Sequence, residues 1–459
     1  MKRTMTIGTT AVVLASMMFL GFQCGSPEFT GAKVYINQKN YKEAMRLLEI
    51  ETQKNPGNEE AWYLLGSLRS ETSDYKGMNV AFTEALKLTS KHENEIKTRR
   101  YNLWATLTNS GVNALQRASS DSLTLYDRAI EDFQKATVAW PDTMITYRYL
   151  GYAHSGKGDQ ENALSSYRTA WQKGKDKESY MRAGRIFLQR GKDQKTQFET
   201  ENADKIRAIG NLKMIERGMA KADVMKLLGA PDNVRKGARG TRKEDWTYSR
   251  YNLSVGLDGD RVVSRTMSRA YSPQIDSTKH RAAMVEFSKA VDVFEEVKAF
   301  DSTDNDNLNL LLQAFVESER IKDAVVGFSQ AVVNDPNNKL NRYILGVLHR
   351  TAGDYDSAIK EFREALRIDP QYVEAMYDLG ATYYNWGVDI IKDAQEKGVE
   401  TTEYKDKFKE AVPLFEKVTE FKKDDPQVWE TLANIYARLG QSEKAVKALD
   451  TADKIRKGN

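Results

Sequence analysis

The stretch YILGVLHRTAGDYDSAIKEFREALRIDP, from Tyr343 to Pro370, decides the fold of this chain. Gly346 and Ala358 are small where two antiparallel helices need to approach closely, and Phe362 is large where a gap between helix pairs needs filling. Pro370 stops the second helix because proline lacks a backbone N–H and cannot continue it. The stretch therefore predicts a helix–turn–helix hairpin, repeated about every 34 residues.

The same spacing of small and large residues returns along most of the chain. Further copies are marked by second-helix residues at Ala44, Phe82, Phe133, Tyr167, Phe328 and Ala445. Two copies are unusual and alike: YNLWATLTNSGV (101–112) and YDLGATYYNWGV (377–388) share seven of twelve positions. Each predicts an extended first helix followed by a polar insertion, so the two halves of the chain look like a duplicated array.

These hairpins resemble the tetratricopeptide repeat (TPR). The resemblance implies a mainly all-α fold, a TPR α-solenoid superhelix in two halves, that binds other proteins or peptides. A small α+β unit interrupts it. This insert is expected to separate the first helix of one repeat, YMRAGRIFLQRG (180–191), from its second helix, which begins near His280.

The insert opens with IERGMAKADVMKLLGAPDNV (215–234), which predicts a helix from Lys221 to Leu228 that ends at Gly229. Alternating residues follow in DWTYSR and YNLSVGLDGDRVVSR, and Asp258-Gly259 is typical of a tight hairpin turn. We expect two helices on a three-stranded antiparallel sheet. The motif resembles the SmpA/OmlA (BamE-like) family, which includes a small lipoprotein subunit of the outer-membrane β-barrel assembly machine.

The N-terminus, MKRTMTIGTTAVVLASMMFLGFQCGS, places Lys2 and Arg3 before an apolar run and a lone cysteine, Cys24. This layout predicts a secretory signal. Cys24 resembles the acylated cysteine of bacterial lipoproteins; the alternatives are an ordinary signal peptide with an incidental cysteine, or an uncleaved anchor. We expect an exported, periplasmic protein that is lipid-anchored to the outer membrane, with a signal peptide over 1–23, TPR arrays over 24–191 and 277–455, and the insert over 205–271.

Composition argues against several functional classes. The chain has 69 basic and 65 acidic side chains, a net charge of +4, so it shows no general signature for nucleic-acid binding. One cysteine and four scattered histidines form no metal-ligand motif. No nucleotide-binding loop or nucleophile motif is present in a suitable context. We therefore expect no metal, no cofactor and no enzymatic activity.

The first helix of each TPR hairpin lines a concave face, and its fifth position points there in the family. Aromatic residues at these positions suit peptide recognition, although they equally suit packing between helices. Two asparagines on the same face could bind a peptide backbone or could bend or cap their helices. The predicted concave-face residues are Phe29, Tyr63, Tyr101, Asn109, Arg148, Tyr343, Tyr377 and Asn385.

A second candidate surface is the basic loop of the insert, formed by Arg235, Lys236, Arg239, Arg242 and Lys243. The pattern is typical of a loop that contacts only solvent. The alternative is a surface that binds anionic lipid headgroups or an acidic partner.

Together these features predict a non-enzymatic protein-binding scaffold of the bacterial cell envelope, involved in outer-membrane or envelope protein assembly. One alternative is a structural or regulatory subunit of a secretion or motility complex. Another is an enzyme in which the insert shapes a cleft.

Overall fold

The computed structural model describes residues 26–119 and 122–458. The predicted signal peptide and Cys24 lie outside the described residues. The chain divides into two compact units, which meet in the sequence between Tyr180 and Met181. None of the helices in the described ranges is both long and apolar enough to cross a membrane.

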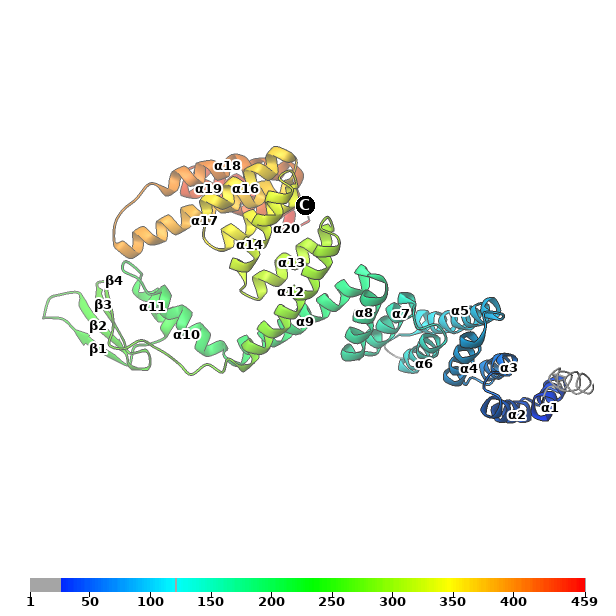
Figure 1. Ribbon diagram of the computed structural model, residues 1–459. Coiled ribbons are helices and arrows are strands. Elements are labelled where there is room, and N and C mark those ends of the chain that lie inside the picture. Colours follow the sequence, from blue (N-terminus) through cyan, green and yellow to red (C-terminus); the bar gives the residue numbers. More distant parts are fainter. Residues whose placement is uncertain (1–25, 120–121, 459) are drawn as a thin grey trace, which may run out of the picture. The chain divides into compact units, whose positions relative to one another are not determined.

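The first unit is a series of antiparallel helix hairpins, in which each odd-numbered helix packs against the next one (Figure 1). Helix α5 is 25 residues long, as its extended pattern predicts. The helices of this unit are α1 (Pro27–Asn37), α2 (Tyr41–Lys54), α3 (Glu59–Glu71), α4 (Tyr75–Leu88), α5 (Glu93–Arg117), α6 (Leu123–Ala139), α7 (Met144–Lys157) and α8 (Gln160–Gly174).

In three of these hairpins, a glycine of the first helix faces an aromatic ring of the second. A Cβ atom added at Gly66 would lie only 2.5 Å from the ring of Phe82. Gly111 meets Phe133, and Gly151 meets Tyr167, in the same way. The ring therefore fills the space that the missing side chain leaves, and the two backbones approach closely.

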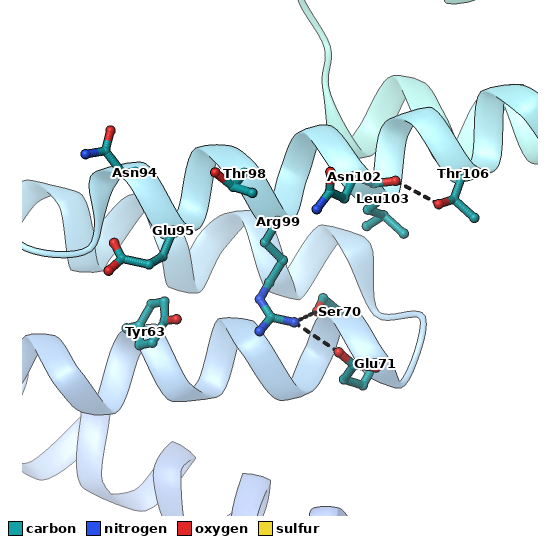
Figure 2. Close-up of a pocket in the computed structure, with 10 residues that line it drawn as sticks. All are labelled: Tyr63, Ser70, Glu71, Asn94, Glu95, Thr98, Arg99, Asn102, Leu103 and Thr106. Carbon is teal, nitrogen blue, oxygen red and sulfur yellow. Dashed lines mark hydrogen bonds and ion pairs between the residues drawn. The ribbon is translucent and has the colours of Figure 1, made fainter.

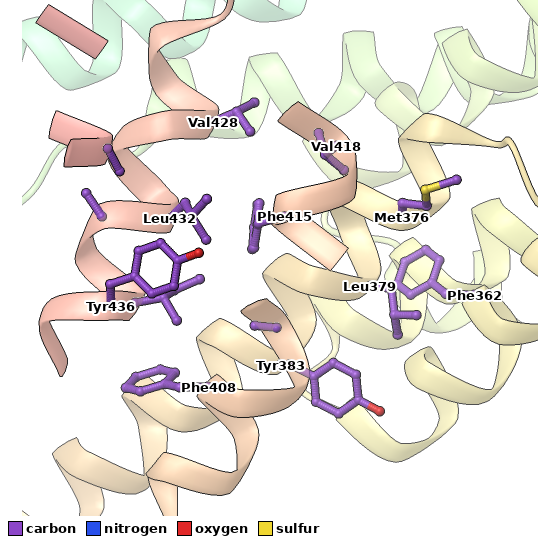
Figure 3. Close-up of a cluster of buried hydrophobic side chains, with 14 of the residues drawn as sticks. Phe362, Met376, Leu379, Tyr383, Phe408, Phe415, Val418, Val428, Leu432 and Tyr436 are labelled. Carbon is purple, nitrogen blue, oxygen red and sulfur yellow. The ribbon is translucent and has the colours of Figure 1, made fainter. Parts of the chain in front are cut away.

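The second unit continues the hairpins, and its core contains residues such as Phe362, Leu379 and Phe415 (Figure 3). Helix α17 is again 25 residues long, as predicted. The helices are α9 (Lys177–Glu201), which begins in the first unit, α12 (Thr278–Phe300), α13 (Asn305–Glu317), α14 (Ile321–Asn334), α15 (Lys339–Thr351), α16 (Tyr355–Ile368), α17 (Val373–Lys397), α18 (Tyr404–Phe421), α19 (Pro426–Arg438) and α20 (Ser442–Arg456).

The α+β insert lies between α9 and α12. Phe294 and Phe287 of α12 pack against Gly184 and Gly191 of α9, so these two helices form one hairpin. The segments that enter and leave the insert are tied together, because the side chain of Asn202 donates to the backbone oxygen of Asp276 at 3.3 Å. A solenoid accepts such an insertion since each repeat contacts only its neighbours.

The insert has four strands, and the expectation of three was wrong. Its elements are α10 (Ala203–Met214), α11 (Lys221–Leu228), β1 (Asn233–Lys236), β2 (Lys243–Tyr248), the 3₁₀ turn η1 (Ser249–Tyr251), β3 (Leu253–Asp258) and β4 (Arg261–Met267). The sheet is antiparallel in the order β1-β2-β3-β4. All four residues of β1 are exposed, so no alternation marks it in the sequence; pairing with β2 fixes it.

The predicted parts of the insert are otherwise present. Helix α11 covers Lys221–Leu228, and Gly259 turns between β3 and β4 with a φ of 61°. Trp246, Tyr248 and Val255 are buried beneath the helices in a separate small core.

Candidate functional site

An open groove of about 730 Å³ lies between α3 and α5, the first helices of two consecutive hairpins (Figure 2). Helix α3 contributes Tyr63, Ser70 and Glu71. The rest of the lining comes from the first half of the long helix α5. The groove therefore lies where the sequence predicts a concave recognition face, and it contains one of the predicted residues, Tyr63.

One flank of α5 presents an uncharged polar stripe to this groove. Asn94, Thr98, Asn102 and Thr106 follow one another at intervals of four, which aligns them along the helix. All four are exposed, and the predicted site residue Asn109 continues the stripe one turn further. Within the described ranges, the carboxamides of Asn94, Asn102 and Asn109 make no hydrogen bond.

A carboxamide carries both donors and an acceptor, as does the peptide group. A row of free carboxamides can therefore pair with the N–H and C=O groups of an extended chain. Neutral groups also lose less solvation than charged ones when a partner covers them. The stripe suits a polypeptide backbone better than it suits a highly charged ligand.

Tyr63 closes one end of the groove and is held rigidly. Its ring stacks on the imidazole of His92 with centroids 4.0 Å apart and planes 8° apart. Glu59 lies behind, with its carboxylate 3.6 Å from Nε2 of His92. A fixed tyrosine offers a broad apolar face at little cost in conformational entropy.

An ion pair crosses the groove further along. Nη1 of Arg99 lies 3.0 Å from the carboxylate of Glu71 and 3.5 Å from Oγ of Ser70 (Figure 2). The side chains of Arg99 and Glu71 are 37% and 60% exposed. Because an exposed pair contributes little to stability, either side chain can turn to an ionic group of a partner.

The other predicted residues of the first unit have different surroundings. Tyr101 is 52% exposed, but it packs against Trp104 and Trp140 and does not line the groove. Phe29 is buried. Arg148 is engaged in two hydrogen bonds, of 2.6 and 2.9 Å, to the buried carboxylate of Asp176.

In the second unit, the predicted aromatic residues are packed into the array. The hydroxyl of Tyr343 donates to Asp378 at 2.7 Å, and Arg350 reaches the same carboxylate at 3.1 Å. Burial, together with Asp378, raises the pKa of Tyr343 above its usual range. Tyr377 lies edge-on against Phe415. Asn385 is half-buried on α17.

The five basic residues predicted as the loop of the insert are all exposed, but they do not form one patch of unopposed charge. Arg235 and Lys236 lie on β1 opposite Asp245 and Glu244 of β2. Lys243 lies opposite Asp258 of β3. Arg239 and Arg242 lie in the loop between β1 and β2 and have no cross-strand acid.

Most of the residues that line the groove were not predicted from the sequence. Thr98, Asn102 and the Arg99–Glu71 pair did not stand out because a polar helix face usually faces only solvent. The spacing of four between the polar residues of α5 was the available signal. In the described part of the chain, no group of three or more histidine, cysteine, aspartate or glutamate side chains is arranged to hold a metal ion.

Two family models match the second unit: a TPR repeat over residues 346–387 and a tetratricopeptide repeat over residues 405–459. No curated protein sequence matches the chain. A crystal structure of MamA is 21% identical and covers 40% of this chain and 98% of its own, with a TM-score of 0.30. A double mutant of MamA RS-1 is 13% identical over 38% of this chain and 86% of its own, with a TM-score of 0.30.

The matched ranges begin in α15 and end just beyond α20. The helix hairpins of this region are therefore tetratricopeptide repeats, a class of repeat that binds other proteins.

Proposed function

We propose that this chain is a non-enzymatic protein-binding scaffold whose α3–α5 groove holds an extended segment of a partner protein. The observation that carries the proposal is the open polar stripe of α5, whose carboxamides make no hydrogen bond in the described ranges. Tyr63 supplies an apolar contact at one end, and the exposed Arg99–Glu71 pair supplies charge further along. Such a surface binds a backbone with few demands on side-chain sequence.

Site-specific photocrosslinking tests this proposal. A photoreactive amino acid replaces Thr98 in the groove or, as the matched control, Glu374, the exposed residue at the same place in the duplicated helix α17. The reagent at Thr98 should give discrete protein adducts in cells. The reagent at Glu374 should give few, because the facing surface there is closed by Arg350 and Asp378.

Equal adducts at both positions, or none at Thr98, would contradict the groove as the binding site. A competing extended peptide should also reduce the Thr98 adducts in a dose-dependent way.

We further propose that the scaffold belongs to the bacterial envelope, as a lipoprotein that assists outer-membrane or envelope protein assembly. The support is in the sequence: the charged and apolar N-terminal run, Cys24, and the similarity of the insert to BamE-like modules. On this proposal the insert, with the exposed Arg239 and Arg242, is a second binding module carried by the TPR scaffold.

Metabolic labelling with a fatty-acid probe tests the anchor. The native chain should be labelled and the Cys24→Ser variant should not. Label on both chains or on neither would argue against lipidation at Cys24. Recovery of only cytosolic proteins among the Thr98 adducts would argue against the envelope role while leaving the groove intact.

A further inference from the structure

A second hollow lies on the other side of α5, away from the groove. It has a volume of about 340 Å³ and lies among the ends of α4 and α6 and the start of α5. Its apolar lining includes Leu86, Ile96 and Trp140, and its charged lining includes Arg100. We name it the Arg100 pocket.

The guanidinium of Arg100 has no ionic partner in the described part of the chain. Its one hydrogen bond is long, from Nη2 to the backbone oxygen of Asn79 at 3.4 Å. Its Nε atom is buried and has no hydrogen-bond partner among the described residues. The ring of Phe82 lies 5.6 Å away, which provides a cation–π contact but no counter-charge. Burial lowers the pKa of Arg100.

The duplicated half of the chain shows that the fold does not need a cation here. Tyr101 aligns with Tyr377, so Arg100 aligns with Met376. Met376 is only 3% exposed and belongs to the apolar core drawn in Figure 3. A methionine therefore suits this position in the hairpin. At this position an arginine without a counter-ion lowers the stability of the folded chain, unless an anion from outside binds to it and supplies the missing charge.

The charges at the pocket indicate the size of that anion's charge. Arg100 and Lys97 line the pocket together with Glu93 and Asp142, so the two signs are balanced. A dianion such as phosphate would be repelled by the two acids. A single carboxylate matches the planar guanidinium, with which it forms two parallel hydrogen bonds. Leu86, Ile96 and Trp140 would surround an apolar group attached to it.

We propose that the Arg100 pocket binds a monocarboxylate that carries an apolar or aromatic group. This site is separate from the groove and does not depend on it. The same chemistry is found in a free organic acid and in the C-terminal residue of a polypeptide. The volume of the pocket admits one such group.

Calorimetric titration of the full-length protein tests the proposal. The probes are N-acetyl-phenylalanine, its C-terminal amide, and a tetrapeptide that ends in phenylalanine with a free carboxylate. The acid should bind at least tenfold more tightly than the amide. A tetrapeptide that binds more tightly than the single residue would identify a polypeptide C-terminus as the ligand, and equal binding would identify a small acid.

The key variant is Arg100→Met, which installs the residue of the duplicated copy. It should abolish the preference for the acid and raise the melting temperature, because it removes an unpaired charge. Arg117→Met removes an exposed arginine from the far end of the same helix, where it lines neither the groove nor the pocket, and should leave the preference unchanged. Arg100→Lys keeps the charge but loses the paired hydrogen bonds, so it should weaken acid binding several-fold.

Equal binding of acid and amide to the native protein, or no binding of either, would overturn the proposal. So would a preference that survives in Arg100→Met. An Arg100→Met variant that fails to fold would show a structural need for the cation, and it would contradict the argument from Met376.

Discussion

The groove between α3 and α5 corresponds to the region between α15 and α17. The two regions share a frame, by which we mean the same positions for tyrosine, glycine and buried phenylalanine. They differ in whether a partner can enter the space between the helices. Tyr63 and Tyr343 occupy the same position, and in both regions a glycine packs on a buried phenylalanine ring. In the first region the groove is open. In the second, Arg350 and Tyr343 both reach Asp378 and draw the two first helices together.

Two substitutions account for much of this difference. Ser70 in the first region aligns with Arg350, and Asn102 aligns with Asp378. Serine and asparagine form no pair with each other, and the Arg99–Glu71 pair that crosses the groove is exposed. Arg350 and Asp378 instead form an ion pair that is mostly buried between the helices. The glycine and aromatic residues shared by both regions therefore build the hairpin, and polar residues at other positions decide whether its surface stays available to a partner.

The largest predicted effect concerns the shared frame. Phe82→Ala and Phe362→Ala should each reduce local stability by about 3–5 kcal/mol, because both rings are fully buried against a glycine. Hydrogen exchange read by mass spectrometry, on peptides from α3–α4 and α15–α16, measures the loss of protection. A much smaller loss at one site would mean that the two hairpins are not built alike.

The next predicted effect is a difference in stability between the closed region at α15–α17 and the open groove at α3–α5. Asp378→Ala should cost about 2 kcal/mol, because it leaves the Arg350 guanidinium and the Tyr343 hydroxyl without their acceptor. The matched change Asn102→Ala should shift stability by no more than about 0.5 kcal/mol, since that side chain is exposed. Exchange rates in α15–α17 and α3–α5 measure both. Equal costs would remove the distinction between the two regions.

Much of the frame could be predicted because its signals are local. Gly346 and Phe362 lie sixteen places apart within one hairpin, and they are found packed together as the pattern predicts. The long helices α5 and α17 and the Asp258-Gly259 turn were also predicted and are present. Each of these features follows from periodicity or from a turn residue.

The features that could not be predicted depend on contacts between residues that are far apart in the sequence. Tyr63 and Tyr343 look alike in the sequence, but Asp378, which engages Tyr343, lies 35 positions further along the chain. Strand β1 has no apolar alternation and exists because β2 supplies its partner. The spacing of Thr98 and Asn102 aligns them on one face of α5, but it does not show whether a groove or open solvent lies opposite that face.

Replacing Ser70 and Asn102 by the residues of the second region tests whether this pair controls access to the α3–α5 groove. Ser70→Arg combined with Asn102→Asp should place an ion pair across the α3–α5 groove like the one in the second region. Stability should change by less than about 1 kcal/mol, because the new pair is partly exposed. Binding at the groove should weaken at least tenfold, about 1.4 kcal/mol. Fluorescence anisotropy with a peptide identified by Thr98 crosslinking measures the affinity.

The single changes Ser70→Arg and Asn102→Asp are the controls for this exchange, because neither alone can make the pair. Unchanged affinity in the double variant would show that the groove is not the binding surface. Weakening by one single change to the same extent would assign the effect to that side chain and not to closure.

The smallest predicted effect concerns the next hairpin in each half of the chain. There, His154 of the first half aligns with Tyr436 of the second. Burial is the main cause that lowers the pKa of His154, and Asp159 at 3.2 Å opposes it only in part. The unfolded chain therefore takes up a proton first as the pH falls through about 6.5, and stability decreases there. One such group sets a slope of at most about 1.4 kcal/mol per pH unit.

The variant His154→Tyr installs the residue of the second half, whose hydroxyl hydrogen-bonds to Glu416 without gaining charge in this range. Melting temperatures between pH 7.5 and 5.5 should fall less steeply for the variant than for the native protein. The other three histidines are present in both proteins, so the difference between the two slopes isolates His154. Parallel slopes would mean that the solvent reaches this imidazole as freely in the folded chain as in the unfolded one, which its 8% exposure argues against.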